Sequence, residues 1–151
     1  MGAEKHVRKI CINCGDITAR ASYKYCSNKC QADYQYRLYI ESWLSGEVTG
    51  LQRLGVVSCH IKRYLREKYK DKCCICGWAE VNIVTGKVPL VADHIDGVWQ
   101  NNHEDNLRLI CPNCDSLTST YAALNKGRGR NGREVSKRVK MARIMFKDVP
   151  G

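Results

Sequence analysis

The ten cysteines of this 151-residue chain constrain its fold more than any other feature, because eight of them stand in close pairs. The pairs are Cys11 and Cys14, Cys26 and Cys30, Cys73 and Cys76, and Cys111 and Cys114. A zinc ion takes four ligands at the corners of a tetrahedron, so a Cys-x2-Cys turn supplies two corners and a second pair must supply the others. The pattern therefore predicts two structural Zn²⁺ ions.

Chain order indicates how the pairs combine. The first two pairs form one set, in which the i, i+4 spacing of Cys26 and Cys30 points both thiols the same way from the first turn of a helix. The last two pairs form a second set that encloses the residues between them. Cys59 and Cys74 are expected to stay outside both sets. Disulfides and buried free thiols are the alternatives to zinc.

The N-terminal residues and the hydropathy of the chain bear on its compartment. No apolar run near the N-terminus resembles a signal peptide, and no segment approaches the roughly 18 apolar residues of a membrane span. We therefore expect a cytoplasmic protein with no membrane partner. In such a reduced compartment, close cysteine pairs bind metal more often than they form disulfides.

The net charge of +10 is concentrated in three segments around an acidic centre. Basic residues dominate 1–30, 59–72 and 124–151, whereas acidic residues dominate 73–123. One basic run alone would be an ordinary solvated surface, but three around a ligand-rich centre favour contact with a nucleic acid. The candidate contacts are Lys62, Arg63 and Arg66 in a basic helix and Lys126, Arg128, Arg130 and Arg133 in a glycine-rich linker.

Hydrophobic periodicity and turn residues predict a small α+β chain. The expected helices cover 31–45, 52–70, 115–125 and 134–147, and the expected strands cover 88–92 and 107–110. Ser27 or Asn28 is placed to cap the first helix. The side chains expected on apolar or core faces include Ile61, Leu65, Tyr69, Leu117 and Leu124. Asn102 and His103 are expected in a solvated loop, where either could contact phosphate or assist a metal.

The residues enclosed by the second cysteine set carry the chemistry, beginning with the motif V-A-D-H-I-D-G at 91–97. Asp93 offers a hard oxygen ligand beside His94, whose ordinary pKa of about 6.5 lets it accept a proton near neutrality. Asp115, at the start of a helix, is the natural second oxygen ligand. Phosphodiester hydrolysis needs both functions, because a water must be deprotonated while a cation offsets negative charge. A capped surface turn is the alternative for so short a motif.

The D-H-I-D-G motif, the run N-x3-N-L-x-L-I-C-P-N-C and the flanking cysteine pairs together resemble the HNH, or His-Me finger, endonucleases. The resemblance covers roughly residues 73–126. The N-terminal cysteine set is similar to small zinc modules attached to phage and intron-associated members. The resemblance implies a ββα-metal unit, a hairpin followed by a helix. This unit would stand beside an N-terminal treble-clef-like zinc module and flanking helices, all in one small zinc-stabilised fold.

The family roles can be carried over to single residues. The resemblance implies that His94 is the general base that activates water and that Asp93 binds a catalytic divalent ion. Asn106 matches the middle residue of the family name, whose side chain would bind backbone across the hairpin loop and hold His94. Asp115 stands where relatives usually have His or Asn, and its carboxylate should favour Mg²⁺ or Mn²⁺.

The resemblance implies a metal-dependent endonuclease that hydrolyses phosphodiester bonds in double-stranded DNA, by nicking or by double-strand cleavage. A phage or mobile-element enzyme of the homing type, acting as a monomer in the host cytoplasm, is the favoured interpretation. A non-catalytic zinc-finger nucleic-acid-binding protein is one alternative, but it leaves Asp93, His94, Asn106 and Asp115 unexplained. The nuclease component of a phage DNA packaging or recombination machine is another.

The same features divide the chain into four parts. Residues 1–50 would form the N-terminal four-cysteine zinc module with its helix, and 51–72 a basic linking helix. Residues 73–126 would form the HNH nuclease domain with the second four-cysteine zinc site. Residues 127–151 would form a basic linker and a C-terminal helix.

Overall fold

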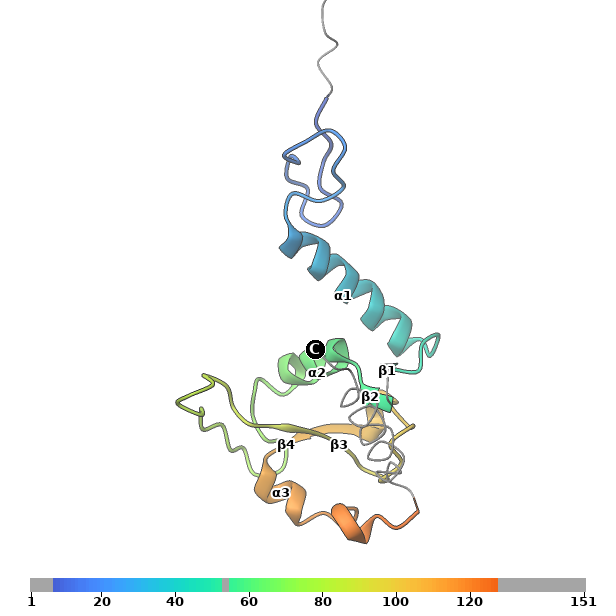
Figure 1. Ribbon diagram of the computed structural model, residues 1–151, viewed down its shortest axis with the longest axis vertical. Coiled ribbons are helices and arrows are strands. Elements are labelled where there is room, and N and C mark those ends of the chain that lie inside the picture. The colour runs from blue at the N-terminus through green and yellow to red at the C-terminus, as the bar shows by residue number, and fades with distance from the viewer. Residues whose placement is uncertain (1–6, 53–54, 128–151) are drawn as a thin grey trace, which may run out of the picture.

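The computed structural model describes residues 7–52 and 55–127 (Figure 1). Its elements are α1 (Asn28–Leu44), β1 (Leu51–Gln52), β2 (Val56–Val57), α2 (Cys59–Lys68), β3 (Val91–His94), the 3-10 helix η2 (Glu104–Asn106), β4 (Leu107–Ile110), α3 (Pro112–Ser116) and the 3-10 helix η3 (Ala122–Leu124). Short helices and two short antiparallel hairpins make this a small α+β fold, as predicted.

Helix α1 begins slightly earlier than predicted because of its cap. The Ser27 hydroxyl accepts a hydrogen bond from the Cys30 backbone N–H at 3.2 Å, which satisfies a free donor of the first turn. The first turn therefore includes Cys30. Tyr36, Ile40 and Trp43 are the buried residues of α1, and their i, i+4, i+7 spacing places them on one face.

Helix α2 is shorter than the predicted range 52–70. Ser58 caps its first turn, and the residues before the cap form the β1–β2 hairpin instead of helix. Gly55 has a φ of +68°, and a Cβ there would meet the Trp99 ring at 2.4–3.1 Å, so the chain turns where a helix was expected. The predicted apolar face is confirmed for Ile61 and Leu65, which are fully buried.

The central hairpin pairs β3 with β4 in antiparallel register. His94 lies opposite Leu107, and Val91 lies opposite Ile110. Strand β4 has the predicted bounds, whereas β3 lies closer to the C-terminus than the predicted range 88–92. The bounds of β3 are set by its pairing with β4, which depends on the whole hairpin. Local hydrophobicity alone suggested that the strand begins earlier.

The predicted helix 115–125 is wrong. Helix α3 opens inside the last cysteine pair and stops at Ser116, and the Thr118 hydroxyl then donates to the Asp115 carbonyl at 2.9 Å. Such a side-chain bond offers the backbone an alternative to continued helix. Leu117 and Leu124 are 85% and 68% exposed, so their predicted place in the core is also wrong.

The main core lies between α1, α2 and the β3–β4 hairpin. Its buried members are Tyr36, Ile40, Trp43, Val57, Ile61, Leu65, Leu107 and Leu109. A smaller cluster joins Ile110 to Cys73 and Cys111 of the second cysteine set. In Figure 1, α2 lies on one side of the hairpin and α3 on the other. The hairpin is therefore held from both faces, and its loop end is where the candidate site lies.

Two expectations fall outside this description. The predicted helix 134–147 and the candidate contacts Arg128, Arg130 and Arg133 lie outside the described residues. Within the described ranges, none of the helices has the length and apolar character needed to cross a bilayer.

Candidate active site and metal centres

Four thiols converge in the N-terminal module. The sulfur atoms of Cys11, Cys14, Cys26 and Cys30 all lie within 4.8 Å of one another. The Sγ–Sγ distance is 3.5 Å between Cys14 and Cys26 and 3.3 Å between Cys26 and Cys30. A tetrahedron with Zn–S bonds of about 2.3 Å has edges of about 3.8 Å. The arrangement can therefore hold zinc with only a small expansion.

The second set has the same form. Cys73, Cys76, Cys111 and Cys114 lie within 4.8 Å of one another, with 3.7 Å between the sulfurs of Cys76 and Cys111. Burial raises the pKa of Cys73, but backbone donors of Cys76, Cys111 and Ile75 lower it to about 6. This favours the thiolate of Cys73, which is the form that binds a metal, whereas burial and the neighbouring thiols raise the pKa of Cys114.

Two of the ten cysteines, Cys59 and Cys74, were predicted to stand outside both zinc sites. Neither set includes Cys59 or Cys74, as expected from their spacing. All ten cysteines are free thiols in the described structure, so the disulfide alternative finds no support there.

Two carboxylates approach each other from β3 and α3. Asp93 lies on β3 opposite Arg108 of β4, and the Arg108 Nε donates to an Asp93 carboxylate oxygen at 2.7 Å. Burial raises the pKa of Asp115, the Asp93 charge raises it further, and the Arg108 charge opposes both. The site therefore offers two hard oxygen ligands with a surplus of negative charge, as divalent cations prefer.

His94 is the last residue of β3 and directly follows Asp93 in the chain. Its Nε2 lies 2.9 Å from the side-chain oxygen of Asn102, in the loop between the strands. Asn102 is only 3% exposed, so the prediction that it lies in a solvated loop is wrong. The exposed position predicted for His103 is confirmed.

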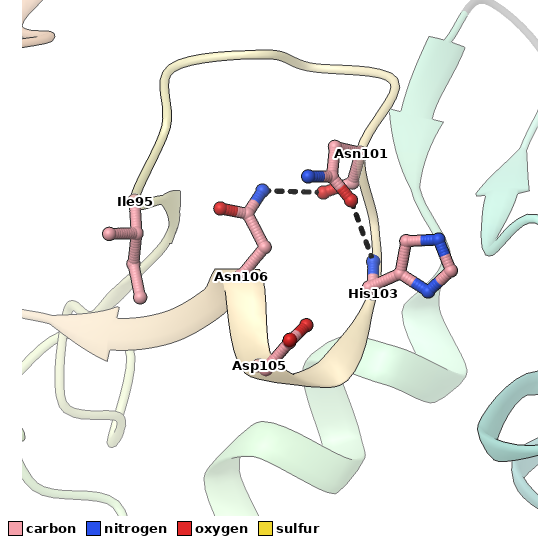
Figure 2. A pocket seen from close by; sticks show the side chains of 5 residues that line it. All are labelled: Ile95, Asn101, His103, Asp105 and Asn106. Carbon is pink, nitrogen blue, oxygen red and sulfur yellow. Dashed lines mark hydrogen bonds between the residues drawn. The ribbon is translucent and has the colours of Figure 1, made fainter.

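Asn106 closes the loop that follows His94. Its side-chain oxygen accepts from the Asp96 backbone N–H at 3.1 Å. Its side-chain nitrogen donates to the Asn101 carbonyl at 2.8 Å (Figure 2). The same nitrogen also donates to the Asp96 carboxylate at 2.9 Å. The side chain thus binds backbone across the hairpin loop and fixes the turn directly behind His94.

An open pocket of about 310 Å³ lies against this loop. Its lining residues are Ile95, Asn101, His103, Asp105 and Asn106 (Figure 2). The lining is mostly polar and comes from both sides of the loop that Asn106 closes.

The predicted catalytic residues come from the end of β3 and from α3. In the part of the chain that the structure describes, the two cysteine sets are the groups of three or more ligand atoms within 4.8 Å. Asp93, His94 and Asp115 do not form a third such group. This suits a histidine that acts on water, because such a base need not bind the ion itself.

The basic candidates on α2 have different surroundings. Arg63 pairs with Asp33 at 2.9 Å and with Glu67 at 2.8 Å, and Arg66 pairs with Asp71 at 2.5 Å. Both guanidinium groups therefore help to hold the fold. Lys62 is exposed and has no ion pair within the described ranges, and Lys126 is also exposed.

Two residues near the site were missed by sequence reasoning. Asn102 lies one position from a histidine in a polar stretch, so nothing local distinguished it from a loop residue. Arg108 was not singled out either, although the alternation of β4 places it on the same face as Asp93. The register of the hairpin, once known, would have identified it.

Comparison with known proteins yields one informative relative. The chain is 47% identical over 102 residues to the H-N-H endonuclease F-TflIV of Escherichia phage T5, which covers 65% of this chain. The chain spans 40% of the length of that relative. No protein-family model matches the chain, and no solved structure matches it either. The hairpin enclosed by the second cysteine set and the identity to the phage protein together make this chain similar to an HNH endonuclease.

Proposed function

We propose that the chain is a metal-dependent endodeoxyribonuclease that hydrolyses phosphodiester bonds in double-stranded DNA. The carrying observation is the end of the β3–β4 hairpin, where His94 follows Asp93 and Asp115 approaches from α3. A proton acceptor beside a pair of oxygen ligands is the minimum set for metal-assisted hydrolysis of a phosphodiester. The phage relative is itself called an endonuclease, which supports the same reaction class.

In this proposal each side chain has a separate task. His94 takes the proton from the attacking water, and Asn106 keeps the loop behind His94 closed. Asp93 and Asp115 would hold the catalytic ion, and their carboxylates suit Mg²⁺ or Mn²⁺. When bound, such an ion offsets the charge that develops on the phosphate and the leaving oxygen. Asp93 would then bind the ion while it also accepts a hydrogen bond from Arg108.

The cysteine sets would hold two structural Zn²⁺ ions that do no chemistry. The second set joins Cys111, which directly follows β4, to Cys73, and Ile110 at the end of β4 packs against both, so the set fixes the hairpin from outside the reacting atoms. Lys62 on α2 and Lys126 behind η3 would contact neighbouring phosphates, together with the arginines beyond residue 127. A monomeric enzyme of the phage homing type, acting in the host cytoplasm, completes the proposal.

Nicking of a supercoiled plasmid tests the assignment. In the presence of Mg²⁺ or Mn²⁺, the purified protein should convert supercoiled plasmid to nicked or linear DNA. The His94→Ala variant should lose roughly 10²- to 10⁴-fold in rate, the usual contribution of a general base. Its DNA affinity in a gel-shift assay should remain unchanged.

Two results would count against the proposal. A wild-type protein that binds DNA but cuts none with either ion would indicate the non-catalytic alternative. A His94→Ala variant that cuts at the wild-type rate would show that the base lies elsewhere.

A further inference from the structure

We propose that Asn102 sets the tautomer and orientation of His94, and that Trp43 of α1 holds Asn102 in place. The N-terminal helix would then be part of the catalytic machinery through these positioning residues. This inference rests on the proposed function, in which His94 is the base. Its structural part, the state of the His94 ring, can be measured without any cleavage.

The side-chain amide of Asn102 can be oriented from its own contacts. One end lies 3.2 Å from the Gln100 carbonyl, which can only accept, so that end must be the NH₂ group. The other end is therefore the oxygen, and it lies 2.9 Å from Nε2 of His94. An amide oxygen can only accept a hydrogen bond, so Nε2 of His94 must carry a proton.

This bond decides which nitrogen of His94 can act as the base. A neutral imidazole has one N–H and one lone pair, so a protonated Nε2 leaves the lone pair on Nδ1. The bond also fixes the rotation of the ring about its side-chain axis. Asn102 would thus present one defined basic nitrogen to water.

Asn102 is in turn held by α1. The indole N–H of Trp43 donates to the Asn102 backbone carbonyl at 2.7 Å, across 59 positions of sequence. Trp43 is 5% exposed and Asn102 is 3% exposed, so water has little access to replace this bond. With the bond from the Asn102 N–H to the Gln100 carbonyl, each polar atom of Asn102 has a protein partner.

The packing around this contact is close. A Cβ on Gly50 would lie 3.1 Å from both the Asn102 Cβ and the Trp43 indole nitrogen. The Trp43 ring also meets Tyr64 of α2 edge-on, with 5.4 Å between ring centroids. The loop therefore has little room to shift relative to α1 and α2.

Helix α1 extends this link to the N-terminal module. Cys30 of the first cysteine set lies in its first turn, and Trp43 lies in its last. Thirteen residues at a rise of about 1.5 Å separate them by about 20 Å. The N-terminal cysteine module would therefore also support the His94 loop, through one continuous helix.

Substitutions at Asn102 test the first step. Asn102→Ala removes the acceptor, and kcat for plasmid nicking should fall on the order of 10²-fold, with KM changed less than threefold. Asn102→Asp keeps an oxygen that can accept from Nε2 but loses the donor to the Gln100 carbonyl, so it should recover part of the lost kcat. A purely structural role for Asn102 would instead lower the melting temperature of both variants and leave kcat intact in whatever protein remains folded.

Trp43→Phe tests the second step, because it removes the indole N–H and keeps an aromatic ring. We expect a drop in kcat of at least fivefold with unchanged DNA affinity. Trp78→Phe is the matched control, since Trp78 packs beside the second cysteine set and not on the loop. Its kcat should equal that of the wild type.

The ¹⁵N signals of the His94 ring give a readout independent of cleavage. In the full wild-type chain, neutral His94 should show one tautomer with the proton on Nε2, and Asn102→Ala should show a mixture. A wild-type ring with the proton on Nδ1, or kcat unchanged in both Asn102→Ala and Trp43→Phe, would overturn the inference. A wild-type chain that shows the Nε2 tautomer yet cuts no DNA would overturn the proposed function alone.

Discussion

Gly97 lies three residues beyond the end of β3, in the loop that follows His94. The segment after α3 contacts this loop at Gly97. The Asn125 side-chain nitrogen donates to the Gly97 carbonyl at 2.8 Å. Gly97 has a φ of +73°, and a Cβ there would lie 2.5 Å from the Asn125 side-chain oxygen and 2.8 Å from a Thr120 methyl. Only glycine satisfies both the backbone and the space at this position.

We therefore expect Gly97→Ala to destabilise the protein more than an alanine at an open glycine. Gly86 is the matched control, because it has a φ of +64° and nothing within 4 Å of its added Cβ. Both substitutions should cost about 1–2 kcal/mol from left-handed backbone strain. Gly97→Ala should add about 1–3 kcal/mol from overpacking. Urea unfolding of the two variants measures the difference, and equal values would show that the Asn125 contact is not tight.

At the scale of elements, the loop between β3 and β4 is fastened to α2 by one carboxylate. Glu104 accepts from the Tyr64 hydroxyl at 2.8 Å and from the Lys68 ammonium at 2.6 Å. Lys68, followed by Tyr64, holds the pKa of Glu104 below its usual range. The charged form is thus favoured when the loop is docked on the helix.

This shift has a defined consequence for stability in acid. A carboxyl whose folded pKa is depressed stabilises the protein above its ordinary pKa of about 4.3, and that stabilisation is lost as the pH falls through the folded value. The melting temperature of the wild type should therefore drop more between pH 7 and pH 3 than that of Glu104→Gln. Glu80→Gln, at an exposed position without an ion pair in the described ranges, should behave as the wild type. Parallel wild-type and Glu104→Gln curves would contradict the role of this carboxylate.

At the scale of the whole molecule, the charge of +10 should govern DNA affinity through salt. Each neutralised phosphate releases counterions, so a log–log plot of affinity against salt should fall with a slope of about −0.9 per contact. Lys62→Ala should reduce the magnitude of that slope by about 0.9 if Lys62 contacts one phosphate. Lys87→Ala removes the same charge from the acidic centre and should leave the slope unchanged. Equal effects of the two variants would show that α2 does not face DNA.

The local parts of the fold were predictable because short-range geometry determines them. The two cysteine sets, the α1 cap at Ser27 and the bounds of β4 follow from spacings of a few residues. The end of α3 was not predictable from periodicity, since a single hydroxyl bond at Thr118 marks the departure from helix. The apolar spacing of Leu117 and Leu124 suggested that these side chains are buried, but both are exposed in the structure.

The sequence by itself determined the chemistry that is available: two sets of four thiols, and a histidine and two carboxylates within reach of one hairpin end. Only the tertiary structure decided how those groups are held. Asn102 is buried because Trp43, 59 positions earlier, reaches its carbonyl, and Arg63 is committed to Asp33 across two helices. Such contacts join residues that are distant in sequence, so no local pattern encodes them. They form only when α1 packs on α2 and on the loop between β3 and β4.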